Sequence, residues 1–278
     1  MDGNHETADP LAAKSAFYEP RRGGFVASEL TRGPWDPGAQ HAGPPAALLG
    51  REVERVAGIG DGPGDRIVGR ITFEILAPVP IAAVRASAEV VRPGRRVEMI
   101  EATLSDESGE PLIRARAWRL LRRRMELPPT TPLSRRRPPP PEEVEINDSF
   151  FPTGYEVGYH TAMEGRFVTG SFIDPGPAVA WMRMRHPLVA GEEPSPLQRV
   201  LVAADSGNGV SAPLDFRRFV FVNVDLSVHL ARMPVGEWVC LDAVTAPEPT
   251  GIGLTGAVIL DEDGPIGLSA QTLLVAER

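Results

Sequence analysis

An aspartate stands where a helix of the C-terminal half would otherwise be apolar. Ser195 can cap this helix, expected at Pro196–Asp205, and Leu197, Leu201 and Asp205 recur at intervals of four on one face. An ionisable side chain on a buried face is costly unless it is paired or functional. A carboxylate in such a place can serve as a general base, so Asp205 is a candidate catalytic residue.

Two amide side chains farther along the chain could complete a site around Asp205. Asn223 lies in a strand expected at Val220–Leu230, and Gln271 in a strand expected at Ile266–Val275. Each amide alone is typical of a solvated strand residue. Beside a buried carboxylate, however, they could hold a water molecule in line for attack on an electrophile. We therefore predict catalytic roles for all three residues.

The elements that must position these side chains occur twice in the sequence. The first copy comprises a helix at Gly43–Val56 and strands near Arg66–Ala77, Val84–Arg92, Arg95–Ser105 and Leu112–Leu121. The second comprises the helix at Pro196–Asp205 and strands near Val220–Leu230, Glu237–Pro247, Ile252–Leu260 and Ile266–Val275. Similar turns begin at Asp106 and Asp261, which are 155 positions apart. A constant offset over a whole unit indicates duplication.

This pattern predicts the fold class and the domain boundaries. One helix followed by about four antiparallel strands, twice, predicts an α+β fold in which each curved sheet wraps around one long helix. Prolines and arginines fill most of 127–141, and such proline density excludes helix interiors and central strands. We expect an N-terminal unit at 1–126, a proline- and arginine-rich linker at 127–150 and a C-terminal unit at 151–278.

The two units differ in polarity where the candidate site falls. At the repeat offset the three polar residues have apolar counterparts: Val53 for Asp205, a residue near Ile71 for Asn223, and one near Trp118 for Gln271. Duplication followed by loss of polar groups in one copy leaves one functional site. We therefore expect one active site per chain, with a catalytic C-terminal unit and a supporting N-terminal unit.

The N-terminal unit offers a possible substrate-binding segment. His41, Ala42 and Gly43 lead directly into its helix, whose N-terminus presents free backbone N–H groups to an oxyanion. Gly43 would let a substrate carbonyl approach closely. Pro44 and Pro45 remove two of the available donors. We expect His41 to support the site rather than to act as its base.

Composition and motifs exclude several other functions. A net charge of −8 argues against nucleic acid as a partner. No apolar run is long enough for a membrane span, and no signal peptide is evident, so a cytoplasmic location is expected. The Gly251–Gly256 stretch fits GxGxxG, but it leads into a hairpin rather than a helix, which excludes a dinucleotide-binding turn. The histidines and the single cysteine show no metal-binding spacing.

Several short motifs, in order, resemble those of the double-hotdog acyl-CoA thioesterases of the thioesterase II group. In the first unit these are Gly33-Pro34-Trp35, His41-Ala42-Gly43 and Val91–Arg96. In the second they are Asn223–Ser227, Glu237-Trp238, Asp261–Gly264 and Ser269–Gln271. The resemblance covers most of 20–125 and 155–278 and implies two tandem hotdog units.

The resemblance also implies an activity. It assigns hydrolysis of an acyl-CoA thioester, without a cofactor, to a water positioned by Asp205, Asn223 and Gln271. Asn223 departs from the family's usual hydroxyl residue, and Ala42-Gly43 from its usual Gly-Gly pair. The acyl chain would lie in an apolar channel near the two helices, and a homo-oligomer is expected. Candidates for binding the CoA phosphates are Arg92, Arg95, Arg96, Arg217 and Arg218.

Two alternatives remain open at the level of sequence. The chain could be a non-catalytic acyl-CoA-binding or scaffold protein, which Asn223 and the two prolines after Gly43 favour. It could also be a hotdog hydratase or dehydratase, although that chemistry uses an Asp/His pair and no GDxNPxH-like string is present.

Overall fold

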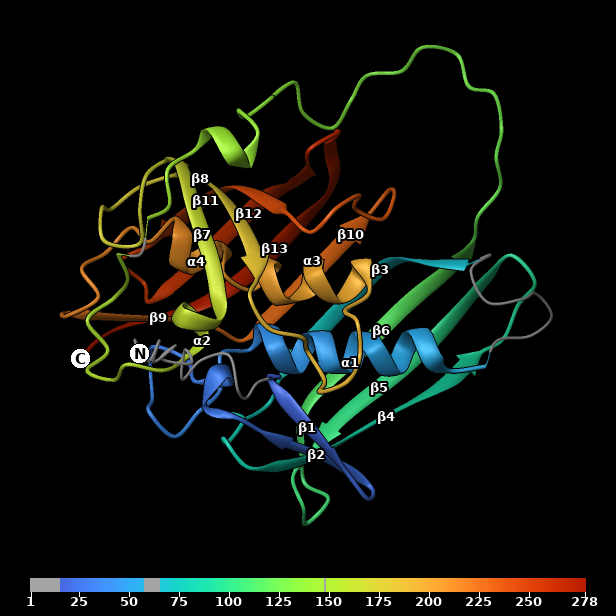
Figure 1. Ribbon diagram of the computed structural model, residues 1–278, viewed down its shortest axis with the longest axis horizontal. Coiled ribbons are helices and arrows are strands. Elements are labelled where there is room, and N and C mark those ends of the chain that lie inside the picture. Colours follow the sequence, from blue (N-terminus) through green and yellow to red (C-terminus); the bar gives the residue numbers. More distant parts are fainter. Residues whose placement is uncertain (1–15, 58–65, 148) are drawn as a thin grey trace, which may run out of the picture.

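The computed structural model describes residues 16–57, 66–147 and 149–278, and it consists of an extended antiparallel sheet that curves around two adjacent helices (Figure 1). The N-terminal half supplies β1 (Tyr18–Arg21), β2 (Gly24–Ala27), β3 (Arg66–Ile75), β4 (Ala83–Arg92), β5 (Val97–Ser105) and β6 (Pro111–Leu121). The C-terminal half supplies β7 (Met163–Thr169), β8 (Ala178–Met184), β9 (Phe219–Asn223), β10 (Asp225–Leu230), β11 (Val239–Pro247), β12 (Ile252–Asp261) and β13 (Gly264–Glu277).

The two halves join edge to edge through β3 and β10. The strands follow the order β1-β2-β4-β5-β6-β3-β10-β13-β12-β11-β8-β7, and β9 also pairs with β13. At the junction Ser227 pairs with Thr72, and their hydroxyl oxygens are 3.3 Å apart. Since these two residues are 155 positions apart, the same offset that relates the repeats, the halves are related by an approximate twofold axis between them.

The principal helices are α1 (Gly43–Arg55) and α3 (Pro196–Ala204), followed by the single turn α4 (Gly207–Val210). The Ser195 hydroxyl caps α3 by accepting the backbone N–H of Gln198 at 3.2 Å, as its sequence predicts. The C-terminal helix ends at Ala204, one residue before its predicted end at Asp205, and the chain bends before α4 begins. A short turn α2 (Tyr159–Ala162) and two 3-10 turns (Glu29–Thr31, Pro141–Glu143) complete the helical elements of the described residues.

A close approach of α1 and α3 builds the core between the two sheet halves. A Cβ atom on Gly43 would lie 2.5 Å from the Val202 carbonyl oxygen, so a side chain there would collide with backbone. A Cβ on Gly50 would lie 2.4 Å from Leu201 Cδ1. Small residues on α1 therefore allow the N-terminus of α1 to lie beside the C-terminal end of α3.

Two hairpins extend the sheet beyond the predicted strands. β1–β2 continues the N-terminal half, and β7–β8 continues the C-terminal half. Their strands are short or interrupted by small and charged residues, so they lack the long alternation that identified the others. Segment 122–140 contains no helix or strand and runs outside the sheet in Figure 1; its Pro139 carbonyl accepts the Trp181 indole N–H at 2.9 Å. Among the described residues no helix is long and apolar enough to cross a membrane.

The strand expected at Val220–Leu230 is divided in two at one residue. Val224 separates β9 from β10, and the register against β13 shifts by one residue across it. Leu226 and Val228 are buried, whereas Val224 is 46% exposed. The shift acts as a β-bulge, which re-aims the side chains that precede it. It turns Asn223 to the same side of the sheet as Leu226, toward the helices.

Candidate active site

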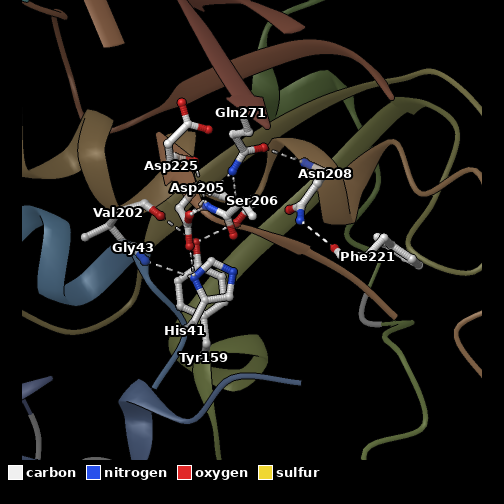
Figure 2. A network of polar contacts seen from close by, with 11 residues as sticks. His41, Gly43, Tyr159, Val202, Asp205, Ser206, Asn208, Phe221, Asp225 and Gln271 are labelled. Atoms are coloured by element: carbon white, nitrogen blue, oxygen red, sulfur yellow. Dashed lines mark hydrogen bonds and ion pairs between the residues drawn. The ribbon is translucent and has the colours of Figure 1, made fainter. Parts of the chain in front are cut away.

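The site forms where the N-terminus of α1 meets the C-terminal end of α3. Asp205 is the C-cap residue of α3 and is only 3% exposed, and its Oδ2 lies 2.9 Å from Nδ1 of His41, just before α1 (Figure 2). Sequence reasoning identified Asp205 and His41 separately but did not pair them. The contact joins the two repeats in one site.

The two predicted amides converge on the same carboxylate. Asn223 Nδ2 donates to Asp205 Oδ1 at 2.8 Å. Gln271 Nε2 donates to the backbone oxygen of Asp205 at 3.1 Å and lies 3.4 Å from its Oδ1. Gln271 Oε1 in turn accepts the backbone N–H of Asn208 at 3.1 Å, which fixes the orientation of the amide. The structure thus brings Asp205, Asn223 and Gln271 together.

A tyrosine that the sequence analysis did not select supports the pair. The Tyr159 ring stacks on His41 with centroids 3.7 Å apart and planes 4° apart. Its hydroxyl donates to the Val202 carbonyl oxygen at 2.7 Å and lies 2.8 Å from Ser206 Oγ. Burial, with a smaller contribution from the Asp205 charge, raises the pKa of Tyr159 well above its usual value. The phenol is therefore neutral, and its hydrogen bonds hold α2 against α3. No motif in the sequence identifies this tyrosine.

His41 Nδ1 has two neighbours that require different protonation. Gly43 N lies 3.2 Å from Nδ1 and could donate to it, whereas Asp205 Oδ2 at 2.9 Å requires Nδ1 to carry the proton. The contact with the carboxylate is the shorter and is charge-assisted, so we assign the proton to Nδ1. The Gly43 N–H is then available to another acceptor. It is the remaining donor of this turn, because Pro44 and Pro45 have no N–H and Ala46 N donates to Ala42 O.

A cavity of about 300 Å³ opens beside these residues. His41, Ala42, Asp205 and Asn223 line its polar end, and its other walls are mostly apolar, with Trp35, Leu76, Val79 and Val222 among them. Gln271 and Gly43 lie behind this lining. Such a cavity, largely apolar with a few convergent polar groups, is typical of a small-molecule site.

The arginines proposed from the sequence lie elsewhere. None of Arg92, Arg95, Arg96, Arg217 and Arg218 lines the cavity beside Asp205. The Arg92 guanidinium lies 5.7 Å from the Trp118 ring centroid on the N-terminal half, and Arg217 lines a second cavity near Phe216. Among the described residues no group of three or more His, Cys, Asp or Glu side chains could hold a metal ion.

The strand pairing corrects the counterparts of the site residues in the first unit. Ser227 and Thr72 are equivalent residues of the two units. Ser227 pairs with the residue before Gln271 in β13, and Thr72 pairs with the residue before Ala117 in β6. The counterpart of Gln271 is therefore Ala117 and not Trp118. By the same pairing Asn223 corresponds to Val68 rather than to Ile71.

Both corrected counterparts are apolar and buried, Val68 at 3% exposure and Ala117 at 0%. The predicted asymmetry of the two units therefore holds with the corrected residues. The first unit has no amides at the equivalent positions.

Solved structures identify the class of fold. The chain is similar to a hot dog fold protein from Alicyclobacillus acidocaldarius, with 16% identity, a TM-score of 0.68, and 91% of each chain covered. It is also similar to the acyl-CoA thioesterase II TesB2 of Mycobacterium marinum, with 15% identity, a TM-score of 0.63, and coverage of 93% of this chain and 94% of that one. The architecture is therefore a hotdog fold.

Family models identify the family. A model of the acyl-CoA thioesterase C-terminal domain matches residues 133–275, and one of the N-terminal domain matches residues 31–120. The chain belongs to the acyl-CoA thioesterase family and is a thioesterase enzyme. No curated protein sequence matches it at a significant level.

Proposed function

We propose that the enzyme hydrolyses an acyl-CoA with a water molecule that Asp205 activates. The observation that carries this proposal is the buried Asp205 carboxylate, held by Asn223 from one side and by His41 from the other, at the end of an apolar cavity. The Asp205 carboxylate takes a proton from the water molecule while the water oxygen attacks the thioester carbonyl carbon. The carbon–sulfur bond then breaks, sulfur leaves with the electron pair and takes up a proton, and the products are the free acid and CoA.

The first unit would bind the thioester carbonyl. Ala42 and Gly43 lie at the N-terminus of α1, where the free Gly43 N–H and the helix dipole favour a developing oxyanion. His41 would keep Asp205 in position through Nδ1. Asn223 and Gln271 would orient the carboxylate and the water it activates.

Thiol release from a panel of acyl-CoAs tests this function. The protein itself adds little background, because its only cysteine, Cys240, is buried and burial raises the pKa of its thiol. Binding of acyl-CoA without thiol release would indicate a scaffold protein. The Asp205–His41 pair also fits proton transfer in hydration, so water addition to an enoyl-CoA without thiol release would indicate a hydratase.

Asn223 is expected to contribute to catalysis through its amide. We expect Asn223→Ala to lower kcat for thiol release by about tenfold or more, because a hydrogen bond to a charged group contributes about 1.5–3 kcal/mol. Asn223→Thr, which returns a hydroxyl to this position, should retain most of the activity. Steady-state kinetics on one acyl-CoA checks both variants; equal activity of Asn223→Ala and wild type would remove Asn223 from the mechanism.

We propose that the two units are tandem hotdogs with boundaries at 1–126 and 151–278. The twofold relation at β3 and β10, and the repetition of one main helix packed against an antiparallel sheet, support this division. The segment between them would be a linker anchored at a few points, such as the ion pair of Arg136 with Asp242 at 2.5 Å.

We further propose that a second copy of the chain covers the outward face of β11–β13. Its one charged side chain, the half-buried Asp242 of β11, is paired with Arg136. Its exposed positions are uncharged: Val244, Ala246, Ile252, Leu254, Gly256, Leu268, Ala270 and Leu274. The matching face of the first unit carries charges instead: Arg70, Glu74, Glu101, Arg114 and Arg116. A large apolar patch marks an interface. An uncharged face can pack on its own copy about a twofold axis without opposing like charges.

Light scattering after size-exclusion chromatography checks this assembly. We expect the mass of a dimer for the wild type and of a single chain for Leu254→Lys, because a lysine at a 61% exposed apolar position would be buried unpaired in the interface. Val91→Lys, at an exposed position of β4 outside this face, is the control and should remain dimeric. A wild type with the mass of one chain would contradict the proposal.

A further inference from the structure

A second, mainly apolar cavity lies next to the cavity beside Asp205, which is called the catalytic cavity below. Its volume is about 460 Å³, and six apolar side chains form most of its wall: Phe151, Phe172, Ile173, Ala212, Leu214 and Phe216. The mechanism proposed above makes no use of it. Its shape and lining suit an apolar group rather than a polar one.

A wall of four aromatic rings separates the two cavities. Trp35 lines the catalytic cavity, and its ring centroid lies 5.0 Å from that of Phe216 and 4.8 Å from that of Phe221. On the other side Phe216 stacks on Phe151 at 4.6 Å, and both rings line the second cavity. One ring of this wall thus faces the reacting groups while the next ones face the second cavity.

The chain segment that contains α4 runs from one cavity to the other. Asn208 lines the catalytic cavity, and Ala212 lines the second one. Between them Gly209 has no side chain, and a Cβ there would lie 3.7 Å from Phe151 and 3.9 Å from Phe172. Gly209 therefore allows the Phe151 and Phe172 rings to pack closely against the backbone of α4.

We propose that the second cavity is the pocket for the distal part of the substrate's acyl chain, and that the aromatic wall selects chain length. This inference rests on the proposed function of the catalytic cavity. A linear acyl chain whose carbonyl lies beside Asp205 would pass between the Trp35 and Phe216 rings and end among Phe172, Ile173 and Leu214. The wall is closed in the structure, so these two rings part when a long chain enters.

Charge favours the acyl chain over the nucleotide as the occupant. The charged residues of the second cavity are Asp174, Asp215 and Arg217, so carboxylates outnumber guanidinium groups there. CoA carries several phosphate charges, and two carboxylates would repel them. These charges at the rim do not repel an uncharged acyl chain.

The spacing along the chain sets the expected length. Asp205 and Ala212 are seven residues apart across the bend between α3 and the single turn α4, and we take the rise of seven helical residues, about 10 Å, as the scale of this separation. With carbon–carbon bonds of about 1.5 Å, a linear chain of roughly eight carbons spans this distance. Chains of fewer carbons would stay in the catalytic cavity, and longer ones would enter the second.

The test compares chain-length profiles of kcat/KM from four to sixteen carbons. For the wild type we expect kcat/KM to rise by up to about fourfold per methylene beyond eight carbons, since each buried methylene contributes transfer free energy. Leu214→Trp, which fills the half-buried side of the cavity, should abolish this rise and leave the four-carbon substrate unaffected. Ile146→Trp, an exposed position that lines neither cavity, should keep the wild-type profile.

A binding measurement keeps this inference separate from catalysis. Dodecyl-CoA with a thioether in place of the thioester cannot be hydrolysed, and its affinity can be measured by calorimetry. We expect it to bind the wild type at least tenfold more tightly than Leu214→Trp, and a butyl-CoA thioether to bind both equally. An unchanged profile together with equal dodecyl-CoA affinity would overturn the pocket assignment. Absence of hydrolysis with tight, Leu214-dependent binding would overturn the proposed function alone.

Discussion

Asp205→Asn should lower kcat/KM for acyl-CoA hydrolysis by a factor of about 10² to 10⁴, the usual contribution of a general base. The substitution removes the charge and keeps the shape. The fold should tolerate it, because His41 can move its proton to Nε2 and accept the new amide N–H at Nδ1, where the structure has a 2.9 Å contact. The loss should therefore appear in thiol release and not in the thermal unfolding midpoint.

Two further variants define what this result means. Asp242→Asn removes a carboxylate of the same type that forms an ion pair with Arg136 away from the cavity, and it should stay within twofold of the wild type. His41→Gln tests the other half of the pair. If Asp205→Asn remained active while His41→Gln was inactive, the general base would be His41, with Asp205 as the group that orients its ring.

Periodicity and turn chemistry were sufficient to predict the repeated elements. Helix α1 and strands β3 to β6 lie within a few residues of their predicted positions, because each has a long apolar pattern bounded by turn residues. The GxGxxG stretch likewise lies in strand β12 and its preceding turn, as predicted. Such signals are local, so they can be read without knowledge of the fold.

The bulge at Val224 shows what local signals cannot provide. From Val222 to Leu230 apolar and polar residues alternate without interruption, and nothing in the residue types marks the shift. Gly69 interrupts β3 at the equivalent position of the first unit, 155 residues earlier. The bulge is a property of the pairing with β13 and β6, and only tertiary structure shows that it turns Asn223 toward Asp205.

The supporting residues of the site depend on tertiary contacts in the same way. Tyr159 follows a stretch with little regular structure, and its role comes from stacking on a histidine 118 positions earlier in the sequence, His41. The pairing of His41 with Asp205 likewise needs α1 and α3 to run in opposite directions. The sequence identified which residues could react, but the antiparallel helices determine that they meet.

Where the second unit has the polar network around Asp205, the first unit has a buried ion pair. Glu98 is fully buried, and Arg119 Nε donates to its Oε1 at 2.7 Å. The Arg119 Nη1 also donates to the carbonyl oxygens of Val53 and Val56, at 3.0 and 2.9 Å, and so caps the C-terminus of α1. In the second unit the end of α3 is held instead by Gln271. The same part of the repeat caps a helix in one unit and holds the proposed catalytic carboxylate in the other.

Arg119→Met should lower the free energy of unfolding by about 3–5 kcal/mol, because it leaves the buried Glu98 charge without its main partner. Arg66, whose Nε lies 3.8 Å from Glu98 Oε1, compensates only in part. Urea denaturation followed by fluorescence measures the change. Activity at low temperature should persist, since Arg119 lies at the end of α1 opposite His41.

Two variants on the same strands separate charge burial from loss of packing. Arg116→Met removes an exposed partner of Glu101, with the two side chains 65% and 38% exposed, and should cost at most about 1 kcal/mol. The double variant Glu98→Leu/Arg119→Met removes both buried charges and should recover much of the lost stability, except for the helix cap. If the double variant were as unstable as Arg119→Met, the cap on Val53 and Val56 rather than the ion pair would hold α1 in place. Arg119 in the first unit and Gln271 in the second would then have the same role, which is to bind the free carbonyl oxygens at the C-terminus of a helix.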